Sequence, residues 1–359
     1  MTSTSTHAYV FPPGEYLRDE LEERGWTAKE FAEILGRPVQ AVSEILNGRK
    51  QIMPETAIEL GDALGTSAEL WTNLQARFNL YEARSNRPMT NDVKRRSQLR
   101  SRVPVTELRR RGWLPDTDNL DSLESAVKDL LEISGLDDEP RFAVAARRSN
   151  ASTTFSNQQT AWLAQLRRRA RTRSVASFDV NAATALAEDL VHRITGPEDL
   201  SQLDQWLAEV GIVLVTLSPL KSSKLDGAVM LLEGGVPVIG LTGRGDRMDV
   251  YVFTLLHELA HLCLGHLGAE GIRTDEDIAS QADGDDLESA ANRQAADWIL
   301  PAELPLPEGR PSVGVVLQIA LRFRVHPCFV VGRIQRERKD WSLLRGSIPR
   351  VRSHVLVEN

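Results

Sequence analysis

The sequence is poor in cysteine and has no long apolar run, and each absence excludes a class of protein. Cys263 and Cys328 are the only cysteines among 359 residues, which is too few for a disulfide framework. No stretch of about 18 apolar residues is present, so an ordinary membrane-spanning helix is not expected. Residues 1–7 lack the basic and then apolar order of a secretory signal. Together these absences predict a cytoplasmic protein with no membrane partner.

The chain is long enough for more than one domain, and its charge is unevenly distributed. A length of 359 residues predicts about two or three domains. The net charge of −7 conceals ten Arg and Lys against two acids in residues 84–111, and eight acids against one Arg in residues 270–288. Basic runs usually form linkers or solvated faces, and acidic runs usually form loops. We therefore expect a basic linker over residues 83–115.

Residues 10–82 carry the signals of five short helices. Thr27 and Glu30 have the spacing of a capping box, in which each side chain binds the backbone N–H of the other residue. Gly36 ends this second helix, and Pro54 stands at the start of a fourth. Two short helices joined by a tight turn are typical of a helix-turn-helix domain. Its second helix, here residues 39–46, enters the major groove of DNA.

The side chains expected to contact DNA fall into two groups. Those that would meet base edges are Gln40 and Ser43, with Glu44 as a further candidate, and those that would hold phosphates are Arg37, Arg49 and Lys50. Residues 1–85, however, carry thirteen acids against eight Arg and Lys, a poor balance for non-specific affinity to DNA. A helical bundle used for dimerisation or for contact with a toxin is the alternative.

Four segments of this region resemble the HigA-type antitoxins of the XRE family. They are PGEYL at 13–17, AVSEILNGRK at 41–50, PETA at 54–57 and LWTNLQ at 70–75. The resemblance covers residues 10–80. It implies binding to operator DNA as a homodimer and regulation of the protein's own operon.

The remaining chain is first helical and then mixed. Helical patterns run through residues 116–199, and strand signals begin at Gly211. Residues 212–215, 227–232 and 236–241 are short and apolar, and a Gly-Gly turn joins the last two. We expect those two to form a hairpin, whose free edge could hold an extended peptide.

A buried helix with two histidines is predicted over residues 253–264. Apolar positions recur there at helical spacing without Pro or Gly. His257 and His261 are four residues apart and share one face, where they can take two corners of a tetrahedral Zn²⁺ site. Glu258 lies one position round the helix, as the general base does in H-E-x-x-H metalloproteases. A chance match with core histidines is the alternative.

A third metal ligand is expected from the helix predicted over residues 286–300. Glu288 can complete a His₂Glu site, and Asn292, one turn later, could hydrogen-bond a ligand. A plain surface carboxylate is the alternative for Glu288. The competing ligands are Asp285, Asp286, Asp297 and His266.

Residues 200–345 resemble the ImmA/IrrE family of zinc metallopeptidases. The resemblance lies in GA at 227–228, DRMD at 246–249, HELAH at 257–261, Glu288 with Asn292, LP at 300–301, VHP at 325–327 and VVGR at 330–333. It implies that His257, His261 and Glu288 are ligands and that Glu258 is the catalytic base. At Gln294 the family often has an aromatic residue, so the packing of this second helix departs from the pattern.

The sequence as a whole predicts an α+β, mostly helical protein. We expect a five-helix helix-turn-helix domain (10–82), the basic linker (83–115), a helical middle region (116–199) and a zincin-like domain with a small sheet and the HExxH helix (200–345). The predicted function is that of a DNA-binding regulator or antitoxin whose zinc endopeptidase domain cleaves a protein partner. Two alternatives stay open: a zinc domain that binds a toxin without cleaving it, and a repressor that senses a ligand.

Overall fold

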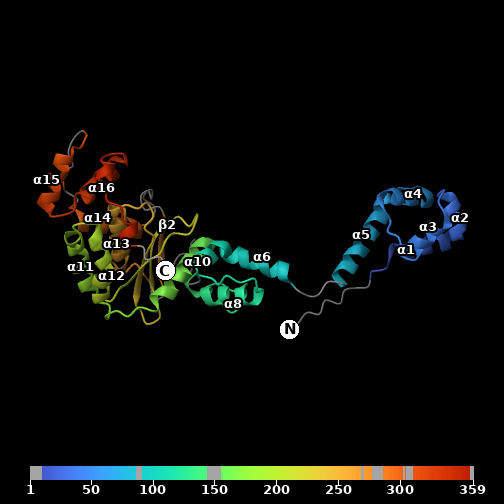
Figure 1. Ribbon diagram of the computed structural model, residues 1–359, viewed down its shortest axis with the longest axis horizontal. Helices are drawn as coiled ribbons and strands as arrows, with labels where there is room; N and C mark the ends of the chain where they lie inside the picture. The colour runs from blue at the N-terminus through green and yellow to red at the C-terminus, as the bar shows by residue number, and fades with distance from the viewer. Residues whose placement is uncertain are drawn as a thin grey trace. The chain divides into compact units, whose positions relative to one another are not determined.

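The chain divides into two compact units, Met1–Asn91 and Asp92–Asn359, and each is described by itself (Figure 1). The computed structural model describes residues 10–85, 91–143, 155–267, 271–276, 286–301, 304 and 310–355.

The first unit is the predicted bundle of five helices. They are α1 (Pro13–Arg24), α2 (Ala28–Ile34), α3 (Val39–Leu46), α4 (Pro54–Leu64) and α5 (Ala68–Ser85). The capping box is present, because Thr27 Oγ1 accepts from the Glu30 N–H and the Glu30 carboxylate accepts from the Thr27 N–H. A Cβ at Gly14 would overlap the carbonyl oxygen of Ile45, so glycine lets α1 cross close to the end of α3. The core includes Leu17, Phe31, Val42, Leu60 and Trp71.

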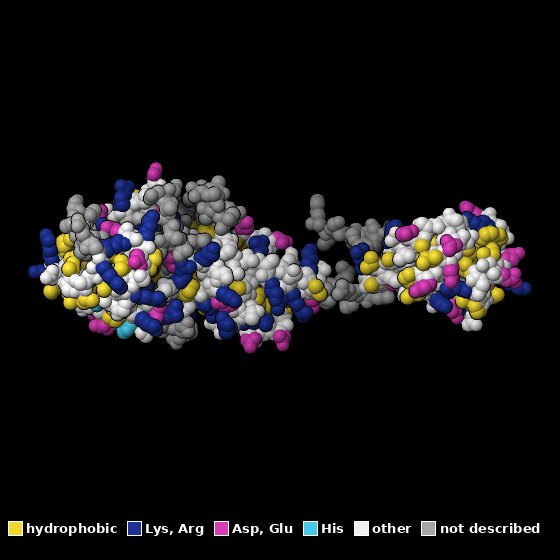
Figure 2. Space-filling view, turned by 90° about the horizontal axis from the view of Figure 1, so that it is seen from above, with side chains coloured by type: hydrophobic (Ala, Val, Ile, Leu, Met, Phe, Trp, Pro, Cys, Tyr) yellow, Lys and Arg dark blue, Asp and Glu magenta, His cyan; other side chains and the backbone are white. Residues whose placement is uncertain are grey.

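Four helices form one layer of the second unit: α6 (Asp92–Arg102), α7 (Val105–Arg110), α8 (Leu120–Leu131) and α10 (Asn157–Ala170). We expected a basic linker over residues 83–115, but α6 and α7 lie within that range and bury Leu99 and Leu108. Arg95 of α6 pairs with Glu124 at 2.7 Å, and Arg102 of α6 donates to the Leu136 carbonyl, so part of this basic charge is engaged within the unit. Basic side chains are spread over this unit with acidic ones among them (Figure 2). The linker interpretation is wrong, because apolar residues between the arginines pack into the core of the second unit and make α6 and α7 part of that unit.

A four-stranded mixed sheet lies at the centre of the second unit. Its strands are β1 (Val213–Thr216), β2 (Leu225–Leu231), β3 (Pro237–Leu241) and β4 (Ile272–Glu276), in the order β1-β3-β2-β4. β2 and β3 pair antiparallel, which confirms the predicted hairpin, and β1 pairs parallel with β3. The hairpin has no free edge for a peptide, because β4 pairs with the other side of β2. That expectation was wrong.

The two faces of the sheet belong to two cores. Neighbouring residues of a strand point to opposite faces, so Val238 joins the core of α8 and α10, and Ile239 joins the core of α13. Gly240 faces α10, where a Cβ would overlap the Leu166 side chain and lie 2.8 Å from the Trp162 ring. Glycine therefore lets α10 pack directly on the sheet backbone.

The core on the other face is built by α11 (Val180–Arg193), α12 (Leu203–Glu209), α13 (Met248–Cys263), α14 (Asp286–Ile299), α15 (Val313–Phe323) and α16 (Pro327–Arg338). Shorter helices are η1 (Pro197–Gln202), η2 (Arg345–Ser347) and α17 (Arg352–Val355). No single helix of the described residues is long and apolar enough to cross a membrane, and only the bent pair of α15 and α16 meets the length and composition together. The α+β, mostly helical fold class is confirmed.

Candidate metal centre

Helix α13 packs against five other elements, which explains why its sequence is apolar around most of its circumference. It contacts β2, β3, α11, α14 and α16. His257 and His261 have no exposed surface, and their Nε2 atoms are 3.0 Å apart. The spacing of four residues therefore places both imidazoles on one face of the helix, as expected.

Glu288 of α14 joins these two histidines. Its Oε2 atom lies 3.2 Å from His257 Nε2 and 3.4 Å from His261 Nε2. The three possible ligand atoms all lie within 4.8 Å of one another. Zinc with four ligands at about 2.0–2.1 Å would hold them about 3.3 Å apart. Two imidazoles and a carboxylate in this arrangement therefore fit a zinc ion in both donor type and spacing.

The charge state of Glu288 also suits a metal ligand. Burial by itself would raise the pKa of its carboxyl, but hydrogen bonds from His257 and His261 outweigh burial and hold that pKa well below its usual range. The carboxylate is therefore ionised at neutral pH, as a ligand must be.

The competing ligands lie elsewhere. Asp286 and Asp297 are exposed on α14 and do not join the cluster, and Asp285 lies outside the described residues. His266 lies behind the cluster, with its Nδ1 3.0 Å from His261 Nδ1, the nitrogen that faces away from His257. His266 is thus placed to fix the orientation of the His261 ring.

Arg273 of β4 is a part of the site that the sequence patterns did not single out. Its Nη1 donates to Glu288 Oε1 at 2.8 Å. Arg273 is the only basic residue among residues 270–288, which contain eight acids. A single arginine within an acidic segment is the one sequence signal that could have identified it as a partner of a carboxylate. Its position depends on β4 pairing with β2, which no local pattern predicts.

Glu258 is also fully buried, and its carboxylate lies against β2. A Cβ at Gly227 would overlap Glu258 Oε1 and would lie 2.8 Å from Thr254 Cγ2. A glycine at this position of β2 therefore makes room for the carboxylate beside the two histidines.

Asn292 has a different partner from the one expected. It lies one turn after Glu288, but its Oδ1 accepts a hydrogen bond from Arg336 Nη2 at 3.1 Å. The structure thus connects the predicted supporting residue to α16.

The predicted DNA-contacting side chains surround α3. Gln40 is exposed and donates to Glu44 at 3.1 Å, Ser43 is half-buried, and Arg49 and Lys50 are exposed just after the helix. Arg37 instead forms an ion pair with Glu59 at 2.6 Å. This pair engages Nε of the guanidinium, and Arg37 stays a predicted phosphate contact.

Two families match separate parts of the chain. The helix-turn-helix family matches residues 17–71, and the IrrE N-terminal-like domain of the M78 peptidases matches residues 209–335.

Curated relatives and solved structures match the N-terminal part. The uncharacterized HTH-type transcriptional regulator YddM of Escherichia coli (strain K12) is 33% identical over 87 residues, which are 24% of this chain and 88% of the relative. Antitoxin HigA-1 of Vibrio cholerae is 40% identical over 73 residues, which are 20% of this chain and 69% of the relative. The structure of a HigA-family addiction module antidote protein from Coxiella burnetii is 36% identical, covers 21% of this chain and 82% of its own, and gives a TM-score of 0.20.

Proposed function

Because the chain belongs to the helix-turn-helix regulators that include the HigA antitoxins, and carries an IrrE-type M78 domain, we propose that it is a DNA-binding regulator that cleaves a protein partner. One observation carries the proposal. Two imidazoles and the Glu288 carboxylate come together where α13 meets α14, and a second buried carboxylate, that of Glu258, follows His257 on α13 and lies against β2. A domain that only binds a partner needs no second carboxylate.

His257, His261 and Glu288 would hold Zn²⁺, since three protein ligands of these types are typical of catalytic zinc sites. Zinc bound there would supply a Lewis acid that polarises the scissile carbonyl and acidifies water.

Glu258 would supply the proton transfers. A buried carboxylate beside the histidines can accept a proton from the attacking water and then donate it to the leaving amine. Gly227 leaves space on β2 for that carboxylate. Peptide-bond hydrolysis needs this pairing of an electrophile with a base.

The first unit would direct the protein to operator DNA as a homodimer. Helix α3 presents exposed Gln40 at its start, and Arg49 and Lys50 follow its end, where phosphates flank the major groove. The partner cleaved by the second unit would be a protein that acts with this regulator, such as its cognate toxin.

The experiment compares the full chain with its Glu258→Gln and His257→Ala variants. Each is loaded with zinc and incubated with a peptide library prepared from a cell lysate, and new peptide termini are counted by mass spectrometry. Glu258→Gln should keep its zinc and its affinity for its own promoter, yet cleave about 10²–10⁴-fold more slowly, because only the base is lost. His257→Ala should lose zinc and cleavage together.

Two results contradict the proposal. Cleavage by Glu258→Gln at the wild-type rate would remove the base from the mechanism. No zinc-dependent cleavage by the wild-type chain would leave the alternative of a zinc domain that binds a toxin, and that alternative predicts toxin binding by Glu258→Gln but not by His257→Ala.

A further inference from the structure

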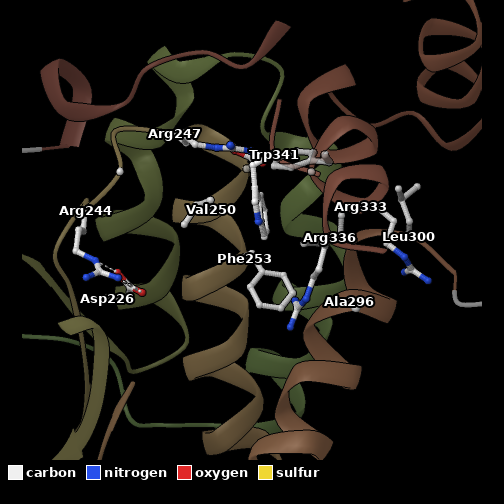
Figure 3. Close-up of a pocket in the computed structure, with 15 residues that line it drawn as sticks. Asp226, Arg244, Arg247, Val250, Phe253, Ala296, Leu300, Arg333, Arg336 and Trp341 are labelled. Carbon is white, nitrogen blue, oxygen red and sulfur yellow. Dashed lines mark hydrogen bonds and ion pairs between the residues drawn. The ribbon is translucent and has the colours of Figure 1, made fainter. Parts of the chain in front are cut away.

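A cavity of about 470 Å³ lies beside the metal centre, between the first half of α13 and α16 (Figure 3). Its walls include Val250 and Phe253 of α13, Ala296 of α14, and Trp341 after α16. Phe253 is one turn before His257, and the two ring centroids are 6.4 Å apart. The cavity therefore adjoins, through Phe253, the turn of α13 that carries His257.

The cavity contains one arginine whose partners are unusual. The Arg336 guanidinium lies over the Phe253 ring at 4.2 Å, and Figure 3 shows it directed down along that ring. Its hydrogen-bond acceptor is the neutral amide oxygen of Asn292, at 3.1 Å. Among the described residues no carboxylate lies within ion-pair distance of Arg336.

The three other arginines that line the cavity each pair with an acid. Arg244 pairs with Asp226 at 2.7 Å, Arg247 pairs with Asp249 at 2.6 Å, and Arg333 pairs with Glu337. These pairs cancel most of their charge, so Arg336 is the cation of the cavity that the described residues leave without a counter-charge.

Keeping the Arg336 guanidinium charged in this cavity costs free energy as long as no anion is bound beside it. Burial lowers the pKa of Arg336, and the nearby positive charge of Arg333 lowers it further. Both effects show that the charged guanidinium is held in an unfavourable environment. A carboxylate that entered the cavity would relieve both and would form short, charge-assisted hydrogen bonds.

We infer that Arg336 and this cavity form a substrate subsite that selects an acidic side chain of the peptide close to the scissile bond. This inference rests on the proposed peptidase function and adds a substrate class to it. The guanidinium binds the Asp or Glu carboxylate, and the aromatic walls of Phe253 and Trp341 accommodate an apolar neighbour in the peptide. Asn292 holds the guanidinium in place from α14.

The test measures binding by the full chain carrying Glu258→Gln, so that bound peptides stay intact. The probes are two fluorescein-labelled nonapeptide libraries that are random except for a fixed Glu or a fixed Gln at the centre, and the readout is fluorescence anisotropy. The Glu library should bind about tenfold or more tightly, the size expected for a hydrogen bond between charged groups. Adding Arg336→Gln should abolish that difference, and adding Arg336→Lys should preserve part of it.

The matched control is Arg322→Gln. Arg322 also lies over an aromatic ring, that of Phe323 at 5.3 Å, but it is exposed and does not line the cavity. It should leave the preference for Glu unchanged. Zinc content and thermal unfolding of each variant show whether the fold is intact. If Arg336→Gln does not fold, the subsite is still tested in two ways. The parent chain must bind the Glu library more tightly than the Gln library, and Arg336→Lys must reduce that difference.

Equal binding of the Glu and Gln libraries to the parent chain would overturn the subsite, as would an unchanged preference in a folded Arg336→Gln variant. Neither result depends on catalysis. Failure of the wild-type chain to cleave any peptide counts against the peptidase function alone, while a preference for Glu that depends on Arg336 would still stand as binding.

Discussion

Arg273 Nη1 donates to Glu288 Oε1 at 2.8 Å, while Oε2 of the same carboxylate lies 3.2 Å from His257 Nε2. The two oxygens of one side chain therefore have separate partners. One is held by β4, and the other faces the histidines. The carboxylate is oriented before any metal binds, since its rotation would break the bond to Arg273.

The first prediction follows from this bond. Arg273→Ala should lower zinc affinity about 10–100-fold, the usual cost of losing a group that orients a metal ligand. The measurement is competition for zinc against a chromogenic chelator at pH 7.

Arg293→Ala is the control for that measurement. Arg293 also lies on the α14 side of the site, but it is exposed, and among the described residues it bonds the Ser289 carbonyl of its own helix. Equal zinc affinities for the two variants would show that Arg273 does not support Glu288. Thermal unfolding of the zinc-free proteins separates this effect from a loss of fold.

The second prediction concerns the space beside the general base. Gly227→Ala should displace Glu258, because the added Cβ would overlap its Oε1 atom. A displacement of about 1 Å is enough to slow catalysis about 10²-fold. Peptide cleavage should therefore fall to that extent while zinc content, measured by elemental analysis, stays at the wild-type value.

Gly314→Ala provides the comparison. Among the described residues a Cβ at Gly314 meets only Ser312 Oγ, at 3.9 Å, so this change in α15 adds a methyl group without a clash there. Cleavage by Gly227→Ala at the rate of Gly314→Ala would mean that Glu258 moves without consequence and is not the base.

The third prediction concerns pH and the start of α16. His326 caps this helix, with Nδ1 accepting from the Cys328 N–H at 3.2 Å. Burial lowers the pKa of His326 from 6.5, and the charge of Glu198 opposes that shift in part. The unfolded chain therefore binds this proton more readily than the folded chain does. The contribution of His326 to stability is complete above pH 6.5 and is lost as pH falls through the lower, folded pKa.

His326→Asn isolates this contribution, because Asn also accepts a backbone N–H at a helix start but does not titrate in this range. The zinc-free proteins are compared by thermal unfolding at pH 7.5 and pH 5. The fall in melting temperature between these two values should be smaller for His326→Asn than for the wild type. An identical fall would contradict the assignment.

The fourth prediction concerns DNA. Arg49→Ala should weaken binding to all sequences alike and reduce the salt dependence by about one phosphate contact, whereas Gln40→Ala should relax the preference at one base position at a cost of about 1–3 kcal/mol. The full chain is titrated with its own promoter fragment and with random DNA at several salt concentrations. No preference for the promoter would favour the bundle used for dimerisation.

The sequence was most informative where a local rule is also the structural reason. The capping box of Thr27 and Glu30 depends on residues three apart, and the shared face of His257 and His261 depends on one helical turn. The hairpin of β2 and β3 depends on a Gly-Gly turn between two apolar segments. Each of these was predictable because the interacting atoms are close in sequence.

The parts that were missed depend on contacts between distant segments. β4 carries charged residues and forms only because β2 offers it a partner, so Arg273 reaches Glu288 in a way that no periodicity records. Arg336 stands in a run of basic residues that look alike in the sequence. Only the folded structure shows that its partner is the neutral amide of Asn292, whereas Arg333 pairs with Glu337. The burial of Leu99 and Leu108 was hidden by the arginines around them.

The contact of α10 with Gly240 bears on how this protein could have been assembled and how it can be divided. Trp162 and Leu166 fill the space above a residue that has no side chain. A gene fragment that began at residue 200 would encode a sheet with one face uncovered, even though it would contain His257, His261 and Glu288. A fragment that is to fold by itself must therefore include α10. The compact unit that contains α10 begins at Asp92, the first residue of α6, and this is the boundary to use when the domain is joined to another DNA-binding domain.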